Sequence, residues 1–439
     1  MYRTDISIDF DKINKKIENL ELTISEGRVK KIIGLTVEVE GIKAFVGELC
    51  VIYNQVNKPV NCEVVGFKDK EVILMALGEL TLISPGCKVI SKGIPLSVMC
   101  SDNLLGKVLD GLGNPIDNSE VVLGDRYNLN NEPPDPMKRK KIRNIMETGV
   151  RAIDAFTTCG EGQRIGIFAG SGVGKSTTLG MIARNAKADV NVIALVGERG
   201  REVLDFIDKD LGEDGMKKSV VVCATSDKAP LVRLKGALTA TAIAEYFRDQ
   251  GKKVILMMDS VTRFAMAQRE VGIAIGEPPA QKGYTPSVFA ILPKLMERTG
   301  TSDKGSITAF YTVLVDGDDF NEPIADTTRG ILDGHIVLSR DLANKNHYPS
   351  IDVLNSLSRL MNEIASKEDI KVASFARDML SEYREAEDLI NIGAYASGTN
   401  KKIDEAIYYH EHIINFLKQG INEKSSFDET VSNLKRIFE

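Results

Sequence analysis

The stretch from Ile165 to Ser176 constrains the fold of this 439-residue chain more than any other part. It reads Ile-Gly-Ile-Phe-Ala-Gly-Ser-Gly-Val-Gly-Lys-Ser, which is typical of a buried strand, a glycine-rich turn and the first turn of a helix. From residue 169 it follows the phosphate-binding P-loop pattern, except that Ala169 stands where the strict pattern has its first glycine. Helix-forming residues continue from 177 to 186. The stretch therefore predicts an α/β domain that binds a nucleotide.

The residue types of this loop suit phosphate binding. Three glycines let the backbone curl so that successive N–H groups face a phosphate, and the helix that begins near Lys175 adds its positive end. Lys175 would reach the β- and γ-phosphates of ATP, and the Ser176 hydroxyl would ligate Mg²⁺. The alternative is a glycine-rich turn that only matches the pattern; the flanking strand and helix favour the nucleotide site. The candidate nucleotide-binding residues are Ala169, Gly170, Ser171, Gly172, Val173, Gly174, Lys175, Ser176 and Thr177.

A second apolar run ends in a carboxylate. Residues 253–258 read Lys-Val-Ile-Leu-Met-Met and are followed by Asp259. In P-loop ATPases a buried strand of this kind delivers an aspartate to the Mg²⁺ shell. Strands at 190–196 and 219–224 alternate with helical segments, a pattern that predicts a parallel sheet with both faces covered. We therefore predict Ser176 and Asp259 as the magnesium-binding residues.

Hydrolysis also needs a group that orients water for in-line attack on the γ-phosphate. Glu198 follows the strand at 190–196, and open parallel sheets bind their ligands at the carboxyl ends of the strands, so Glu198 is the candidate base. The alternative is a surface glutamate in a charged turn. The transition state also needs fixed positive charge, which any of four arginines can supply, although each can equally be a surface or ion-pairing residue. These arginines are Arg199, Arg263, Arg340 and Arg359.

The composition excludes several classes of protein. The chain is 43% hydrophobic and 27% charged, as globular proteins are, and its net charge of −6 offers no basic field for nucleic acid. No apolar run approaches the roughly 18 residues of a membrane helix, so any membrane association is expected to be peripheral. The first residues lack the basic and apolar regions of a signal peptide. The six cysteines form no Cys-x-x-Cys pair, which predicts free thiols in a reducing compartment.

The pattern along the chain predicts four segments. Residues 1–24 have apolar positions at helical spacing and predict a helical arm. Residues 25–95 alternate short Val- and Ile-rich runs with turns, which predicts a small antiparallel β-barrel. Residues 96–365 are the predicted nucleotide-binding domain, and we interpret its basic run at 138–141 as a solvated loop rather than a nucleic-acid patch. Residues 366–439 predict a helical C-terminal domain. The helices expected in and just before it are 357–365, 371–392 and 402–420.

Taken together, these motifs resemble those of the catalytic subunits of rotary ATPases. The resemblance is carried by residues 106–117, 169–176, 197–203 and 259–270. Two further stretches, 276–289 and 327–340, resemble the flagellar type III export ATPases within that family. The resemblance covers about residues 25–439. It implies a RecA-like P-loop ATPase core with a parallel sheet, an N-terminal antiparallel β-barrel, a helical C-terminal domain, and a homohexameric ring with ATP and Mg²⁺ at the subunit interfaces.

The resemblance also assigns roles to single residues. It implies that Glu198 activates the attacking water and that Arg199 and Arg263 face the phosphates. The stretch 354–359, Leu-Asn-Ser-Leu-Ser-Arg, resembles the one that supplies an arginine to the neighbouring subunit's site. This favours Arg359 as that arginine, with Arg340 as the alternative.

Two tyrosines complete the predicted nucleotide site. Tyr348, before Pro349, resembles the family's adenine-stacking aromatic, and an aromatic face suits a purine. The alternative for Tyr348 is a core tyrosine. Tyr395 is the candidate for a second wall of the adenine site.

The function expected from the resemblance is a cytoplasmic Mg-ATPase at the inner face of the membrane that energises or primes the export of flagellar proteins. The implied partners are further copies of the chain, export-gate membrane proteins, stalk-like and regulator proteins, export substrates and chaperones, with no nucleic acid. Three alternatives stay open: the ATPase of a non-flagellar injectisome, a subunit of a rotary ATP synthase, and a nucleic-acid helicase or termination factor on a similar core.

Overall fold

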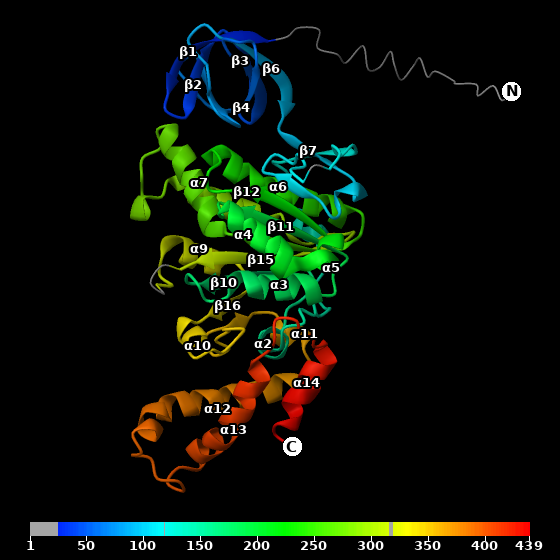
Figure 1. Cartoon of the computed structure of the whole chain (residues 1–439), viewed down its shortest axis with the longest axis vertical. Helices are drawn as coiled ribbons and strands as arrows, with labels where there is room; N and C mark the ends of the chain where they lie inside the picture. Colours follow the sequence, from blue (N-terminus) through cyan, green and yellow to red (C-terminus); the bar gives the residue numbers. More distant parts are fainter. Residues whose placement is uncertain (1–24, 118, 316–318) are drawn as a thin grey trace, which may run out of the picture. The chain divides into compact units, whose positions relative to one another are not determined.

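A computed structural model describes residues 25–117, 119–315 and 319–439. The helical arm predicted for residues 1–24 lies outside the described residues. The described chain up to Leu96 and the chain from Ser97 onward form two compact units (Figure 1). None of the described helices is both long enough and apolar enough to cross a lipid bilayer.

The first unit is a closed antiparallel barrel, as predicted. Its strands follow one another around the barrel in the order β1, β2, β5, β4, β3, β6. Alternate residues point inward, so Val37, Val39, Ile52, Val64 and Leu74 fill the interior and are fully buried. The strands are β1 (Glu26–Ile33), β2 (Thr36–Glu40), β3 (Glu48–Tyr53), β4 (Pro59–Lys68), β5 (Glu71–Ala76) and β6 (Lys88–Pro95).

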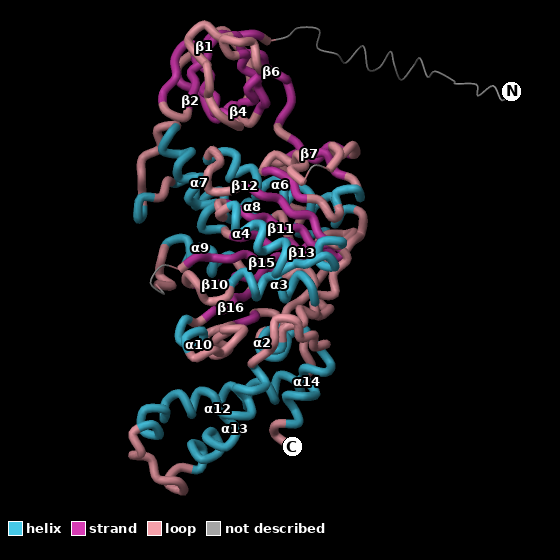
Figure 2. Tube along the Cα trace, in the orientation of Figure 1, coloured by secondary structure: helices cyan, strands magenta, loops and turns pink. Residues whose placement is uncertain are grey.

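The second unit is built on a nine-stranded sheet, counted over the described residues, in which β14 pairs only with β15. From β16 to β8 the strands are parallel, in the order β16, β10, β15, β13, β11, β12, β8, and β17 adds an antiparallel edge. The central strands are buried along their whole length because helices cover both faces, as Figure 2 shows. The strands are β8 (Val108–Asp110), β10 (Arg164–Ala169), β11 (Val190–Val196), β12 (Ser219–Ala224), β13 (Lys253–Asp259), β14 (Gly300–Thr301), β15 (Ser306–Leu314), β16 (Gly334–Leu338) and β17 (Leu357–Ser358), with β7 (Ser97–Cys100) and β9 (Asp125–Asn128) paired apart from the sheet.

Helices pack on the strands of the sheet and on one another. The longest of them, α6, packs against β11, β12 and β13 and is buried almost throughout, which explains its run of Ala and Thr. The segment after Glu198 forms an α-helix, a π-helical stretch (η3) and a second α-helix, and the π-helical stretch packs on the P-loop helix α3. The helices are α2 (Arg151–Phe156), α3 (Lys175–Asn185), α4 (Gly200–Asp205), η3 (Phe206–Leu211), α5 (Gly212–Lys217), α6 (Pro230–Asp249), α7 (Val261–Ala274), α8 (Pro286–Glu297), α9 (Pro323–Ile331), α10 (Arg340–Asn344) and α11 (Met361–Ile364), with short 3₁₀ turns η1 (Asp102–Leu104), η2 (Pro136–Lys138) and η4 (Gln281–Gly283).

The C-terminal helices α12 (Lys367–Asn391), α13 (Lys401–Leu417) and α14 (Phe427–Arg436) follow the sheet within the same unit (Figure 1). The first two form an antiparallel hairpin close to the predicted 371–392 and 402–420. Helix α14 was not predicted, although Ser426 and Glu429 form a capping box at its start.

The helix predicted for 357–365 is wrong in its first half. Leu357 and Ser358 form β17, which pairs with β16, and only Met361–Ile364 is helical. Serine hydroxyls in this segment bond the backbone and compete with helix formation: Ser356 donates to Asp352 O at 2.6 Å, and Ser358 donates to Thr158 O at 2.8 Å.

The basic run at 138–141 is partly anchored. The guanidinium of Arg139 donates to the carbonyl oxygens of Thr299 and Glu297 at the end of α8. Burial lowers the pKa of Arg139. This arginine therefore fixes the linker to the sheet domain, while the three lysines of the run are exposed.

Candidate active site

The P-loop connects β10 to α3 at the carboxyl end of the sheet. Gly172 and Gly174 have φ of +79° and +88°, the left-handed conformation that glycine adopts without strain. Around Gly172 the space where a Cβ would lie is open to 4 Å, as a phosphate cradle requires. Val173 is buried, and its carbonyl accepts a hydrogen bond from Ser350 Oγ at 2.6 Å. The loop is thus anchored through Val173, while Gly172 is exposed.

Lys175 lies between two carboxylates. Its Nζ is 2.6 Å from Asp259 Oδ1 and 3.4 Å from Glu198 Oε1. Burial opposes the charged form of Lys175, but the two carboxylates outweigh burial and raise its pKa. Lys175 is therefore protonated at neutral pH and joins the ends of three elements: α3, β13 and the turn after β11.

Glu198 is buried, with 7% of its surface exposed. Burial raises the pKa of Glu198 above the ordinary range of a glutamate, Lys175 opposes that rise, and Asp259 adds to it. Glu202, in the first turn of α4, shares a hydrogen bond with Glu198, and its own pKa is lowered. A carboxylate whose pKa moves toward neutral pH suits a general base.

Two of the predicted arginines, Arg263 and Arg199, differ in whether they contact Glu198. Arg263 Nε lies 3.4 Å from Glu198 Oε1, and its side chain passes directly over Gly197, where a Cβ would lie 2.7 Å from the Arg263 Cδ. Gly197 therefore leaves the space that Arg263 occupies. Arg199 is not part of this cluster: its side chain is 68% exposed and its guanidinium lies 3.5 Å from Glu202.

Arg359 lies at the opposite end of the sheet. Its N–H donates to Asp333 O, immediately before β16. β16 runs parallel to β10, with Ala169 paired to Leu338, so the P-loop lies beyond the far end of both strands. The five residues of β16 span about 16 Å at roughly 3.3 Å per residue. Arg359 therefore cannot reach the phosphate site of its own chain. Arg340 is the second residue after Leu338, which ends β16, and so lies at the P-loop end.

The two predicted tyrosines are placed differently. The ring of Tyr348 lies 3.6 Å from the Cβ position of Gly174 and is 42% exposed, so its face is available beside the P-loop. Tyr395 lies in the turn between α12 and α13, where its hydroxyl bonds Asn400 O and Asp404 Oδ1. Among the described residues no contact joins Tyr395 to Tyr348.

The residues at this end of the sheet fit a bound Mg-nucleotide. Ser176 is exposed in the first turn of α3, and Thr177 follows it half-buried. The described residues contain no group of three or more His, Cys, Asp or Glu side chains that could hold a metal by themselves. A P-loop Mg²⁺ does not need one, because it uses one hydroxyl, one carboxylate shell, phosphate oxygens and water. Ser176 and Asp259 are the two protein groups predicted for this role.

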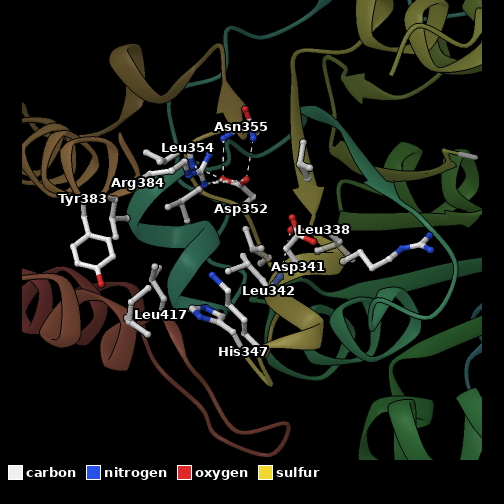
Figure 3. A pocket seen from close by; sticks show the side chains of 18 of the residues that line it. Leu338, Asp341, Leu342, His347, Asp352, Leu354, Asn355, Tyr383, Arg384 and Leu417 are labelled. Atoms are coloured by element: carbon white, nitrogen blue, oxygen red, sulfur yellow. Dashed lines mark hydrogen bonds and ion pairs between the residues drawn. The ribbon is translucent and has the colours of Figure 1, made fainter. Parts of the chain in front are cut away.

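A cleft of about 660 Å³, whose lining includes none of the P-loop residues 170–176, lies between the segment 337–355 and helices α12 and α13 (Figure 3). Asp352 is its polar centre and accepts hydrogen bonds from Asn355 Nδ2 and from Arg384 of α12. His347 lies in its wall, only 3% exposed, and Nε2 of His347 has no hydrogen-bond partner. Burial, with Lys418 nearby, lowers the pKa of His347 to about 4.

We expect His347 to make the protein less stable in acid. Its folded pKa of about 4 lies below the ordinary 6.5, so between these values the unfolded chain binds a proton that the folded chain does not. Stability is therefore lost as pH falls through 6.5, by about 2 kcal/mol between pH 7 and pH 5. Thermal unfolding of His347→Phe should show a shallower fall over that range than wild type. His412→Phe, at an exposed position, should keep the wild-type slope; a His347→Phe slope equal to it would contradict the prediction.

Comparison with known proteins agrees with this geometry. Three family models match: the ATP synthase alpha/beta family β-barrel domain at residues 29–93, the nucleotide-binding domain of the same family at 149–358, and the T3SS EscN ATPase C-terminal domain at 365–436. The chain is 55% identical to the flagellum-specific ATP synthase of Bacillus subtilis over 96% of its length and 98% of that protein's.

The chain belongs to the family of flagellum-specific ATP synthases and type 3 secretion system ATPases. It is also 47% identical to the type 3 secretion system ATPase of Xanthomonas euvesicatoria, over 97% of each chain. The assembled ATPase EscN of enteropathogenic E. coli, solved in complex with its central stalk EscO, superposes with a TM-score of 0.87 at 44% identity and covers 94% of this chain and all of that one. The chain is therefore an ATP-hydrolysing enzyme with the predicted barrel, α/β core and C-terminal helices.

Sequence reasoning missed two side chains at this end of the sheet. Glu202 shares a hydrogen bond with Glu198, and its place as an acidic residue in the first turn of the helix that follows Glu198 is the signal that would have found it. Thr312 donates a hydrogen bond to Asp259, but the strand that carries it also has Thr308, so the sequence alone does not single it out.

Proposed function

We propose that this chain is the Mg²⁺-dependent ATPase of a flagellar type III export apparatus. The observation that carries the proposal is the cluster in which Lys175 lies between Asp259 and Glu198 at the end of a P-loop sheet. The likeness to a flagellum-specific ATP synthase over nearly the whole of both chains supports the flagellar assignment.

In the proposed reaction the P-loop amides and Lys175 bind the β- and γ-phosphates. Ser176 and the water shell of Asp259 would hold Mg²⁺, which would supply positive charge beside the phosphates. Glu198 orients the attacking water and accepts its proton, since its raised pKa suits a base. Arg263 places positive charge next to Glu198, and Tyr348 stacks on adenine. Arg199 is exposed beside this cluster and would face the phosphates only after its side chain turns inward.

We propose that the catalytic unit is a homohexameric ring. Arg359 lies at the end of the sheet away from its own P-loop, so it supplies charge to the site of the neighbouring subunit. Arg340 is the alternative, and its position at the P-loop end makes it the weaker candidate. The proposed domains are the barrel at 25–95, the ATPase domain at 96–365 and the helical domain at 366–439, preceded by an arm at 1–24.

The proposed setting is the cytoplasm, at the inner face of the cytoplasmic membrane. A stalk-like protein is the best supported partner, because the similar ATPase EscN is solved in complex with its central stalk. Export-gate membrane proteins, a regulator, export substrates and their chaperones are the other proposed partners. An injectisome is the alternative setting, since 47% identity joins the chain to a type 3 secretion system ATPase.

Complementation tests the flagellar assignment. A Bacillus subtilis strain without its flagellum-specific ATP synthase should regain flagellin export and swimming when it expresses this chain, because 55% identity extends over 98% of the replaced protein. Lys175→Ala, expressed to the same level, should restore neither. The purified chain should hydrolyse Mg-ATP without a second type of chain. Hydrolysis without recovery of export would point to the injectisome, and hydrolysis only with a second chain type would point to a rotary synthase subunit.

A further inference from the structure

Thr312 lies on β15, the strand between the P-loop strand β10 and the strand β13 that ends in Asp259. In the parallel pairing Tyr311 lies opposite Met258, which brings Thr312 beside Asp259 on the next strand. Thr312 is fully buried. A buried hydroxyl in a strand otherwise packed on apolar neighbours must find a hydrogen-bond acceptor, because leaving it unpaired costs free energy.

Two acceptors lie within reach of this hydroxyl. Thr312 Oγ1 is 2.8 Å from Asp259 Oδ1 and 3.2 Å from Met258 O. A hydroxyl has one proton, and a hydrogen bond to a carboxylate is the shorter and stronger kind. Lys175 donates to the same oxygen, Oδ1. The Asp259 Oδ1 atom therefore accepts hydrogen bonds from both Lys175 and Thr312.

We propose that Thr312 is a positioning residue of the magnesium site, whose hydroxyl holds the Asp259 carboxylate in place when Lys175 moves to the phosphates of ATP. This inference rests on the proposed role of Asp259 in the magnesium shell. Lys175 cannot serve the carboxylate and the nucleotide equally, because the phosphates carry more negative charge than Asp259. Once Lys175 has moved, the Thr312 hydroxyl is the remaining side-chain donor to Oδ1 among the described residues.

The test compares Thr312→Val with wild type by the binding of a fluorescent ADP analogue in excess Mg²⁺ and in EDTA. Valine keeps the shape and removes the donor. Loss of an outer-shell hydrogen bond typically costs about 10- to 100-fold in metal affinity. We therefore expect the Mg²⁺ concentration for half-maximal hydrolysis to rise about tenfold, and the tightening of nucleotide binding by Mg²⁺ to shrink, while binding in EDTA stays within about twofold.

Two further variants complete the test. Thr312→Ser keeps the hydroxyl and should restore the Mg²⁺ response, whereas Thr308→Val should leave it unchanged. Thr308 is equally buried on the same strand, but its hydroxyl accepts a hydrogen bond from the Gly162 N–H, away from Asp259. If Thr312→Val does not fold, Thr312→Ala must show the same shift.

The inference is overturned if Thr312→Val responds to Mg²⁺ as wild type does, or if it loses nucleotide binding equally with and without Mg²⁺. Failure of the proposed function looks different: wild type itself would then hydrolyse ATP without a divalent cation.

Discussion

Glu198→Gln should lower the rate of ATP hydrolysis by roughly 10²- to 10⁴-fold, the range by which a positioned general base contributes. The amide keeps the size and one oxygen of the carboxylate but cannot accept a proton from water at neutral pH. Lys175 would retain its ion pair with Asp259, so the P-loop should stay in place. We therefore expect nucleotide affinity to change by no more than a few-fold, so that the loss is in kcat rather than in KM.

Steady-state hydrolysis and equilibrium binding of a fluorescent nucleotide separate these effects. Glu213→Gln is the matched control, because Glu213 is an exposed glutamate of the same chain segment outside the cluster. A Glu198→Gln enzyme that retains more than a tenth of wild-type kcat would show that another group activates water. Glu202, which is hydrogen-bonded to Glu198, would then be the first candidate.

The sequence predicted much of this site because its elements are local in the chain. The P-loop is one continuous strand, turn and helix, and Asp259 closes one apolar strand. Parallel sheets gather strand ends at one edge, so the motif predicted that Lys175, Glu198 and Asp259 would meet before any coordinates were known. The barrel strands were also predictable from the sequence, because short Val- and Ile-rich runs are separated by turn residues.

What the sequence could not predict depends on partners distant in the chain. Residues 357–358 became an edge strand because Gly334 and His335 of β16 offered a pairing partner, and local helix propensity did not decide. The motifs predicted that both Arg199 and Arg263 would face the phosphates. Arg263 contacts Glu198 because Gly197 has no side chain and leaves room for it. Thr312 gains its significance only from the strand order, which places β15 between β10 and β13.

The same strand order separates Arg359 from the P-loop of its own chain. We therefore expect Arg359 to act in the active site of the neighbouring subunit. Arg359→Ala should lower hydrolysis by roughly 10³-fold or more, as loss of an arginine finger does. Arg359 is exposed, and its guanidinium donates a long hydrogen bond of 3.4 Å to Arg329 O, so the folded chain should tolerate the change. Rate per chain should rise with protein concentration in wild type, because a separated chain lacks its neighbour's arginine.

Mixing the two inactive variants tests this arrangement directly. Chains with Glu198→Gln keep Arg359, and chains with Arg359→Ala keep Glu198, so a mixed ring contains interfaces at which both groups are intact. In a randomly assembled equal mixture, about one quarter of all head-to-tail interfaces in the ring are of this kind. About one quarter of wild-type activity should therefore return. Two variants that stay inactive when mixed would place the base and the arginine in one subunit. Full activity of Arg359→Ala alone would transfer the role to Arg340, whose alanine variant should then show the loss and the recovery.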